Sequence, residues 1–426
     1  MSSVEQLPRV AVIGAGISGL TAAYLLRARY AVTLFERNDY LGGHTRTVTL
    51  PAGAPDAGTP VDTGFIVMNH RNYPLLTRLF AELAVPLRDS DMSFGYWDQA
   101  TGIQYAGGTL SGLWAEPRLL LRPAYWRMIA DVMRFYKRAP GDLAAGRLRG
   151  LTLGQMIRQH GYGAWFAPHH LLPMAAAIWS TPCEGILDYP AESLVRFFAN
   201  HGLLQLSDRP QWRTVVGGSQ IYVERLRARL TGAVRLETPV LGVRRAAGRP
   251  VVRTAAGEES FDHVVIATHA DEAHALLADE PGAPERVCLA PWRYERNGVV
   301  LHTDRNALPP RRGAWASWNY CRETGNPAVS LTYDMNRLQG LDTQRHYLVT
   351  LNRQTSLAPG CVLDTCDFQH PSFTFPALEA RAQLEQLNGR DGVFFCGAYF
   401  GNGFHEDGCR SGVRVAQALG VAWPAS

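Results

Sequence analysis

Lysine is almost missing from this sequence of 426 residues. Of its 42 basic residues, Lys137 is the only lysine and the others are arginine. Catalytic roles that depend on a lysine amine are therefore largely excluded. Lys137 itself falls in a basic stretch with helical apolar spacing, which is typical of a helix surface rather than of a strand beside a reactive centre.

Cysteine pairs and metal-ligand spacings are also lacking. The seven cysteines are an odd number, scattered along the chain without a Cys-x-x-Cys pair. This pattern argues against a disulfide framework and offers no zinc-ligand spacing. The adjacent His169 and His170 have no acidic or cysteine partner at ligand spacing, so we expect no metal site.

Long apolar runs are absent as well. No stretch of about 18 apolar residues occurs, and the N-terminal lead is short and polar. We expect a cytoplasmic protein, soluble or peripherally bound at the inner face of the cell membrane. The net charge of +4 is too small to indicate nucleic-acid binding.

A dinucleotide-binding unit opens the chain. Residues 9–13 (RVAVI) read as a buried parallel strand, and the glycine turn at 14–19 leads into helix-forming residues and a second strand. Gly14 makes the tight turn, Gly16 lets the backbone approach a pyrophosphate, and Gly19 permits helix–strand packing.

Polar residues around this unit complete its expected contacts. The helix N-terminus, with Ser18 in its first turn, offers unpaired N–H groups to phosphate. Glu36 ends the second strand and is placed to accept the ribose hydroxyls, which disfavours a 2′-phosphate. Arg37 follows it and is included among the expected cofactor contacts.

The segment at 41–47 (LGGHTRT) distinguishes FAD from NAD. It resembles the flavin-containing amine oxidase superfamily and its phytoene desaturase relatives, where a Gly-Gly-Arg-x-x-Ser/Thr segment wraps the FAD pyrophosphate. The resemblance implies FAD as the cofactor, with contacts from Gly43, His44 and Thr45. His44 stands at the usual arginine position, and Arg46 is a second candidate for the phosphate.

Three later segments resemble the same superfamily. Residues 61–64 (VDTG) are similar to its Asp-x-Gly strand. Gly217-Gly218 and residues 238–240 are similar to the segment in which its chain returns to the FAD domain, and this likeness implies that the backbone at Val240 meets the adenine. Residues 395–412 are similar to its C-terminal FAD motif. That likeness implies a second helix N-terminus whose N–H groups stabilise negative charge on reduced flavin.

The C-terminal motif supplies the remaining candidate site residues. The resemblance implies cofactor contacts from Gly397, Tyr399, His405 and Glu406, with Tyr399 in place of the usual glutamate. His405 is a candidate catalytic residue, as proton shuttle or hydrogen-bond donor, since histidine titrates near neutrality. The alternative is that the acids after it only cap a helix. His370 is a second catalytic candidate, in a loop that in this superfamily often passes the isoalloxazine.

Other side chains carry weaker signals. Ser219 lies outside any Gly-x-Ser-x-Gly turn, so serine hydrolysis has no support. Aromatic residues usually belong to a core, and we expect at most two of five candidates to line a substrate cavity. These five are Trp179, Trp318, Tyr320, Tyr333 and Phe404.

The predicted fold is α/β with two intertwined domains. An FAD-binding, Rossmann-like parallel sheet is assembled from residues 1–70, 212–285 and 390–426. A mixed α+β substrate domain is assembled from residues 71–211, which are largely helical, and 286–389. We expect the flavin at their junction.

Three functions remain open. The first is a desaturase or dehydrogenase of fatty acyl chains, with hydride transfer from a substrate C–H bond to flavin N5. This follows a resemblance to a bacterial FAD/NAD-binding branch linked to methyl-branched and furan fatty acids, carried by residues 318–320, 333–339, 370–371 and 403–408. The second is an amine oxidase acting on a small amine. The third is a redox-silent FAD protein, an isomerase or an assembly partner.

The stretch at 118–138 predicts a membrane-surface helix. It carries six cations and one acid, with apolar residues at three- and four-residue steps and Trp126 beside them. An ordinary amphipathic helix packed on its own domain is the alternative. The sequence sets neither the substrate, the electron acceptor, the linkage of the flavin nor the oligomeric state.

Overall fold

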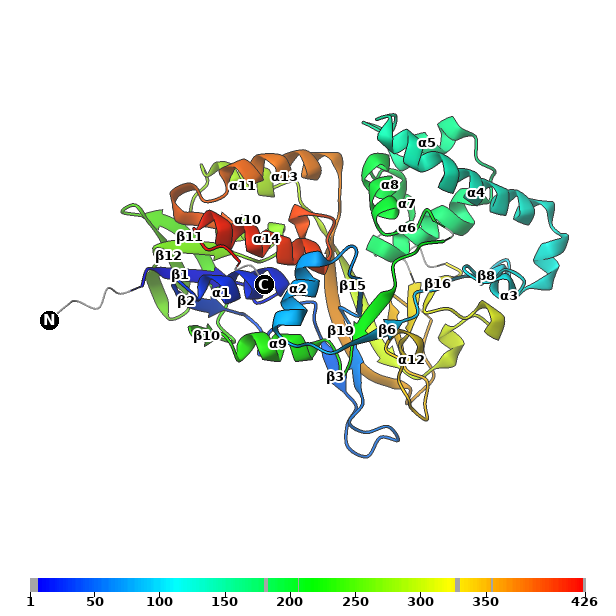
Figure 1. Ribbon diagram of the computed structural model, residues 1–426, viewed down its shortest axis with the longest axis horizontal. Helices are drawn as coiled ribbons and strands as arrows, with labels where there is room; N and C mark the ends of the chain where they lie inside the picture. Colours follow the sequence, from blue (N-terminus) through cyan, green and yellow to red (C-terminus); the bar gives the residue numbers. More distant parts are fainter. Residues whose placement is uncertain (1–6, 180–182, 206, 326–329, 354, 424–426) are drawn as a thin grey trace.

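A computed structural model describes residues 7–179, 183–205, 207–325, 330–353 and 355–423. Its first layer is a five-stranded sheet in which every neighbouring pair is parallel, as the near-continuous apolar runs of its strands predict (Figure 1). In spatial order the strands are β10 (Ala233–Arg235), β2 (Ala31–Phe35), β1 (Arg9–Ile13), β14 (His263–Ile266) and β20 (Val393–Phe395).

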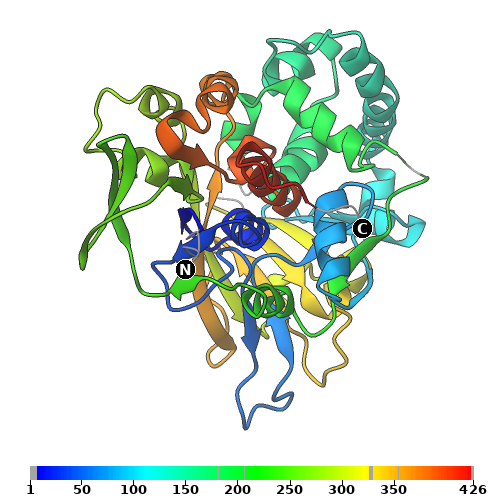
Figure 2. The same cartoon turned by 60° about the vertical axis from the view of Figure 1, so that its left-hand side comes forward.

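Two helices from opposite ends of the chain pack together against this sheet. α1 (Ile17–Leu26) follows the glycine turn and α14 (His405–Ala418) follows the C-terminal motif, and Figure 2 shows them side by side. A Cβ on Gly412 would lie only 2.5 Å from the carbonyl oxygen of Ser18. Glycine is therefore needed there for the close helix contact.

The second layer is a mixed seven-stranded sheet that draws on distant parts of the chain. Its strands pair antiparallel except for β16 with β7, which are parallel. Their order is β19 (Val362–Pro371), β15 (Tyr294–His302), β18 (Leu348–Leu351), β17 (Ser330–Asp334), β16 (Trp318–Arg322), β7 (Phe94–Asp98) and β8 (Gln104–Ala106).

Helices cover one end of the molecule, as expected for residues 71–211. They are α3 (Leu110–Leu113), α4 (Pro123–Ala144), α5 (Leu153–His160), α6 (Leu172–Trp179), α7 (Cys183–Leu187) and α8 (Ala191–Asn200). A short 3₁₀ turn, Pro117–Leu121, precedes α4, so the helix proper starts at Pro123. No helix of the described residues is long and apolar enough to cross a membrane.

Smaller elements join the layers. Short strands form three further sheets: β3 (Thr47–Thr49) with β4 (Pro60–Asp62); β5 (Val67–Met68), β9 (Trp212–Val215) and β6 (Leu87–Ser90); and β11 (Val240–Ala246), β12 (Arg249–Thr254) and β13 (Gly257–Ser260). The remaining α-helices are α2 (Pro74–Glu82), α9 (Gln220–Arg227), α10 (Ala270–Leu276), α11 (Pro284–Leu289), α12 (Met335–Leu338) and α13 (Phe375–Leu387). α13 packs beside α11 on the side of the parallel sheet (Figure 1). The predicted α/β fold is confirmed, while the domain boundaries stay a prediction.

Candidate active site

One cavity of about 730 Å³ lies where the two main sheets and the helical region meet. The carboxyl ends of the parallel strands open into it, where ligands of open α/β sheets bind. Most of the predicted site residues line it: Gly14, Gly16, Ser18, Glu36, Arg37, Gly43, His44, Val240, His370, Gly397, Tyr399 and His405. The sequence motifs thus converge on one site although they span nearly the whole chain.

The glycine turn shapes one end of the cavity. Gly14 has a φ of +100°, which favours glycine, and a Cβ on Gly19 would collide with the Gly14 carbonyl oxygen. Gly19 therefore packs the helix and does not face the cavity. A Cβ on Gly16 would meet nothing within 4 Å, so Gly16 leaves open space beside the first turn of α1.

Glu36 is held rigidly at the same end. Its side chain is buried, with one carboxylate oxygen accepting from the N–H of Ala15 at 2.9 Å and the other from Asn38 at 3.0 Å. The N–H of Thr238 donates to the Glu36 carbonyl at 2.8 Å, which brings the start of β11 and Val240 alongside. Glu36 lines the cavity and each carboxylate oxygen can accept a further hydrogen bond, as a ribose-binding acid requires.

The residues present fit an FAD molecule. Open space at Gly16 and the unpaired N–H groups of the α1 first turn suit its diphosphate. At the other end, the hydroxyl of Tyr399 and the indole N–H of Trp318 are buried without a hydrogen-bond partner among the described residues, although both side chains line the cavity. Buried polar groups of this kind normally have a partner, so a polar ligand is expected to satisfy them.

His405 is fixed between an aromatic ring and a hydroxyl. Its ring stacks on Phe65 with centroids 3.9 Å apart, and its Nε2 lies 2.9 Å from the Thr45 hydroxyl oxygen. Thr45 in turn hydrogen-bonds the Tyr222 hydroxyl at 2.5 Å and does not line the cavity. Burial, with His44 nearby, lowers the pKa of His405 to about 3. Titration of this ring near neutrality is therefore not expected in these surroundings.

Glu406 turns away from the cavity. Its carboxylate accepts from the backbone N–H groups of Leu75 at 3.2 Å and Leu76 at 2.9 Å, in the first turn of α2. Burial raises its pKa. The predicted cofactor contact of Glu406 is not seen in its side chain, which ties α14 to α2 instead. Asp407 caps its own helix by accepting from Asn402 and Phe404.

The segment at 61–64 acts through its neighbours. The buried Asp62 carboxylate accepts from the N–H and hydroxyl of Ser219, both at 2.8 Å, and from Gln339 at 3.1 Å. A Cβ on Gly64 would collide with the carbonyl oxygen of His44. This motif therefore positions the loop that carries His44 and does not itself contact a ligand through Asp62.

Arg46 is not available to a phosphate. Its guanidinium pairs with Asp364, at 2.5 and 3.1 Å, and does not line the cavity. The alternative phosphate ligand proposed at Arg46 is therefore wrong.

His370 lines the cavity, with its Nδ1 3.0 Å from the amide nitrogen of Asn297.

Aromatic residues dominate the other half of the cavity. Trp179, Trp318, Tyr333 and Phe404 all line it, which is more than the two expected, while Tyr320 packs behind them against Tyr96. Sequence reasoning missed further lining residues, because nothing local marks them: Met174, Ile178, Phe197, His201 and Trp212. His269 was also missed, but its position directly after the buried strand β14 is a signal that could have found it.

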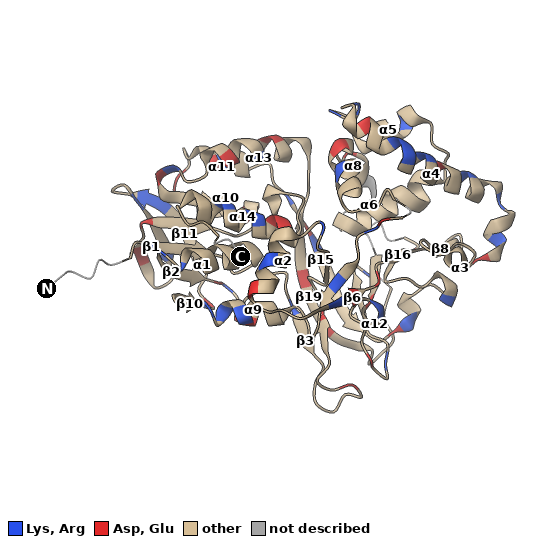
Figure 3. Ribbon diagram, in the orientation of Figure 1, with Lys and Arg blue, Asp and Glu red and all other residues tan. Residues whose placement is uncertain are grey.

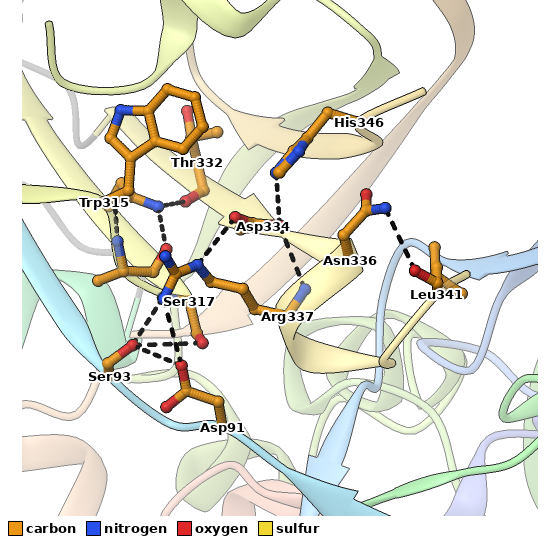
Figure 4. A network of polar contacts seen from close by, with 12 residues as sticks. Asp91, Ser93, Trp315, Ser317, Thr332, Asp334, Asn336, Arg337, Leu341 and His346 are labelled. Atoms are coloured by element: carbon orange, nitrogen blue, oxygen red, sulfur yellow. Dashed lines mark hydrogen bonds and ion pairs between the residues drawn. The ribbon is translucent and has the colours of Figure 1, made fainter. Parts of the chain in front are cut away.

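A polar network holds two of these aromatics in place. The buried Asp334 carboxylate pairs with His346 at 2.8 Å and Arg337 at 3.3 Å (Figure 4). The N–H of Asp334 donates to the carbonyl of Ser317, one residue before Trp318. The two strands that carry Trp318 and Tyr333 are thereby fixed, and these rings meet edge to face at 89°.

Charged side chains are confined to the nucleotide end. Among the described residues that line the cavity, those with formal charge are Glu36, Arg37 and Glu272, and the last two form an ion pair at 2.6 Å. The aromatic half contains neutral polar groups only. Lys137 lies on the exposed surface of α4, outside the cavity.

Known proteins share this architecture. A family model described as flavin containing amine oxidoreductase matches residues 17–337. Coproporphyrinogen III oxidase of Mycobacterium leprae is 27% identical over 316 residues, 68% of this chain and 65% of that protein, so less than two thirds of its length is matched. Cyclohexylamine oxidase of Brevibacterium oxydans has a TM-score of 0.70 at 17% identity, over 97% of this chain and 98% of that one. The CLA-producing fatty acid isomerase from P. acnes has a TM-score of 0.66 at 15% identity, over 98% and 99%.

Proposed function

Since the chain belongs to the flavin containing amine oxidoreductase family and is an FAD-dependent oxidoreductase, we propose that its substrate is the hydrocarbon of a fatty acyl chain. The enzyme removes a hydride and a proton from neighbouring carbons, so that a C=C bond forms. Bound FAD supplies the hydride acceptor. The chain's own residues exclude water, orient the hydrocarbon and offer a neutral base for the proton.

The distribution of charge carries this proposal. An ammonium or carboxylate group buried in the aromatic half would face no opposite charge among the described lining residues. Burying an unpaired ion costs several kcal/mol, roughly, even after relaxation. An uncharged chain meets no such cost, because Met174, Ile178 and Phe197 offer apolar contact. A fatty acid isomerase and cyclohexylamine oxidase both share the fold, so the fold is compatible with an acyl substrate and does not select it.

Two features disfavour a small amine. Lys137, the only lysine, is not among the residues that line the cavity, so no lysine side chain can hold a water molecule beside the flavin. The rings of Trp318 and Tyr333 meet edge to face, so they do not form two parallel sides of an aromatic cage around an amine. The neutral ring of His405 remains as a proton acceptor for acyl chemistry.

Anaerobic flavin reduction tests the substrate class. Purified holoenzyme is mixed with phospholipid vesicles carrying methyl-branched or monounsaturated chains, and in parallel with primary amines and polyamines. We expect bleaching of the flavin absorbance by an acyl substrate, and a product lighter by two hydrogens in mass spectrometry. Bleaching by an amine contradicts the proposal, and a product of unchanged mass with a moved double bond identifies an isomerase instead.

We also propose that the tip of the helical region contacts an anionic membrane. The expected apolar stripe of α4 proves to be core, since Tyr125, Met128 and Phe135 are buried. Other large apolar residues are exposed around the start of the helix: Leu110, Trp114, Leu121 and Trp126. Leu121 is 86% exposed, and basic residues run along α4 (Figure 3). Exposed apolar groups beside cations are the composition of a headgroup-level contact.

A further inference from the structure

The cavity lining offers little fixed positive charge to the diphosphate of FAD. Among the described lining residues, Arg37 is the only arginine or lysine, and it is already paired with Glu272 at 2.6 Å. Arg46 is occupied by Asp364 outside the cavity. The helix N-terminus contributes only a partial charge, about half an elementary charge. The two negative charges of the diphosphate therefore lack a matching cation.

Three imidazole rings stand where such a cation is needed. The ring centroid of His44 lies 5.7 Å from that of His269 and 5.4 Å from that of His370, and all three line the cavity. The cluster is next to the phosphate turn, because a Cβ on Gly43 would lie 3.2 Å from the Cα of Gly16.

Each ring comes from a different element. His44 is in the loop between β2 and β3, His269 lies between β14 and α10, and His370 is in the last part of β19. The Nε2 of His44 lies 3.0 Å from the carbonyl oxygen of Gln369, to which it donates, so its Nδ1 is left to take up a proton.

Their burial favours the neutral form of all three rings. Burial, together with the neighbouring rings, lowers the pKa of His44 and of His269 to about 4 and that of His370 to about 3. The other ionisable or charged groups that face the cluster, from every element packed against it, are Glu36, Arg37, Asp271, Glu272, Tyr294 and His405. A diphosphate brings two charges of the sign that favours protonation.

We propose that His44, His269 and His370 form a cationic site for the FAD diphosphate by taking up a proton when the cofactor binds, so that FAD is held more weakly as pH rises. The inference rests on FAD binding and is independent of the acyl substrate. It assigns to His44 the function that the superfamily's arginine would have as a permanent charge.

Linkage gives the sign and size. Protonation is stronger in the complex than in the free protein, so between the two pKa values the dissociation constant rises with pH by about tenfold per unit for each proton taken up. In the free protein the pKa values of His44 and His269 are about 4, so the whole range from about pH 5.5 to 8.5 lies above them. The diphosphate itself keeps its charge throughout that range.

Equilibrium titration of the apoprotein with FAD tests this. The dissociation constant is measured by quenching of flavin fluorescence from about pH 5.5 to 8.5. We expect at least a tenfold weakening across the range in wild type. Titration calorimetry in buffers of different ionisation enthalpy should show net proton uptake on binding. A wild-type constant unchanged within about twofold, or no proton uptake, overturns the proposal.

Variants separate the cluster from a general effect of pH. His44→Arg supplies a fixed charge, so its FAD affinity should be flatter with pH and exceed wild type at the alkaline end. His44→Gln should bind more weakly at acid pH and also lose slope. His274→Gln, on α10 but outside the cavity, is the matched control and should behave as wild type. A wild-type slope in both His44 variants, with apoprotein folded by circular dichroism, assigns the pH dependence elsewhere.

Discussion

At the scale of single residues, the glycine turn separates two functions that one motif usually combines. Gly19 is needed for packing, since its Cβ would collide with backbone, whereas the position of Gly16 opens onto the cavity. Substitutions at these two glycines should therefore have different consequences, one on folding and one on the cofactor.

Gly16→Val tests the cofactor side of that separation. The added side chain enters open space, so the melting temperature of the apoprotein should change by only a few degrees. The same side chain fills room that the FAD diphosphate needs, and the purified variant should lack the yellow flavin spectrum. Full flavin occupancy in this variant would sink the assignment of the site. Gly19→Val, as the comparison, should fail at folding.

The histidines show how residue roles depend on surroundings. The sequence indicates His405 because histidine titrates near pH 7, yet burial lowers the pKa of its ring and favours the neutral form. Its contact with Thr45 and its stacking on Phe65 make it a positioned hydrogen-bonding group. The motif predicted a site residue here, and the structure puts His405 in the lining of the cavity, whereas its pKa depends on the surrounding fold.

At the scale of elements, the C-terminal helix α14 joins the cofactor site to α2. Glu406 accepts from two N–H groups in the first turn of α2, which no residue of α2 itself can satisfy. The partners of this contact lie far apart in the sequence, so no local sequence pattern can indicate it. It explains why an acid follows His405 without facing the cavity.

Glu406→Ala should therefore destabilise the fold while leaving flavin binding intact. Two backbone donors are left unpaired, which costs roughly 1–3 kcal/mol in the free energy of unfolding. Urea denaturation followed by circular dichroism measures the loss, and flavin absorbance measures the cofactor. Glu385→Ala, at an exposed pair with Arg414, is a control of little expected effect. Flavin loss without destabilisation would return Glu406 to the cofactor site.

The helical tip provides a second test at this scale. Arg127 and Arg134 both pair with the buried Asp131, so replacing them would perturb the fold. The combined variant Leu121→Glu, Arg122→Glu and Lys137→Glu avoids that pair. We expect it to lose salt-sensitive co-sedimentation with anionic vesicles.

Its control carries the same kind of change elsewhere. Arg227→Glu with Arg229→Glu alters exposed cations at and just beyond the end of α9, in the other part of the molecule. This control should bind vesicles as wild type does. If wild type ignores anionic vesicles, or if both variants lose binding equally, the membrane contact at the helical tip is wrong.

At the scale of the whole molecule, four histidines of the cavity make the stability of the fold depend on pH and on bound FAD. His44, His269, His370 and His405 have pKa values of about 3 to 4 in the fold, against an ordinary value of 6.5. Groups with depressed pKa values contribute stability that is present above about pH 6.5 and is lost as pH falls through the folded values. Asp62, with its pKa raised to about 6 by burial, and Glu406, whose pKa burial also raises, act in the opposite direction, but these are two groups against the four histidines.

The melting temperature of the apoprotein should consequently fall between about pH 7 and pH 5. The melting temperature of the FAD-bound protein should fall less, because the negative charge of the diphosphate stabilises the protonated rings. Thermal melts with and without FAD across this range provide the measurement. A double variant, His44→Gln with His370→Gln, should flatten the apoprotein curve. An apoprotein that is equally stable or more stable at pH 5 would contradict this account.

What the sequence determined by itself is the cofactor half of the protein. The strand–glycine turn–helix unit, Glu36 and the C-terminal motif are readable because the turn geometry, helix start and strand end depend on neighbours a few residues away. Those residues were predicted to meet FAD, and the structure brings most of them to one cavity.

What only the tertiary structure decided is the composition of the cavity and the partners of its charged groups. Arg46 looked free in sequence but is paired with Asp364, and Glu406 looked like a cofactor ligand but caps α2. His44, His269 and His370 come together through three separate elements. Local patterns report propensity and spacing, whereas burial, pairing and pKa depend on segments that meet only when the two sheets pack against each other.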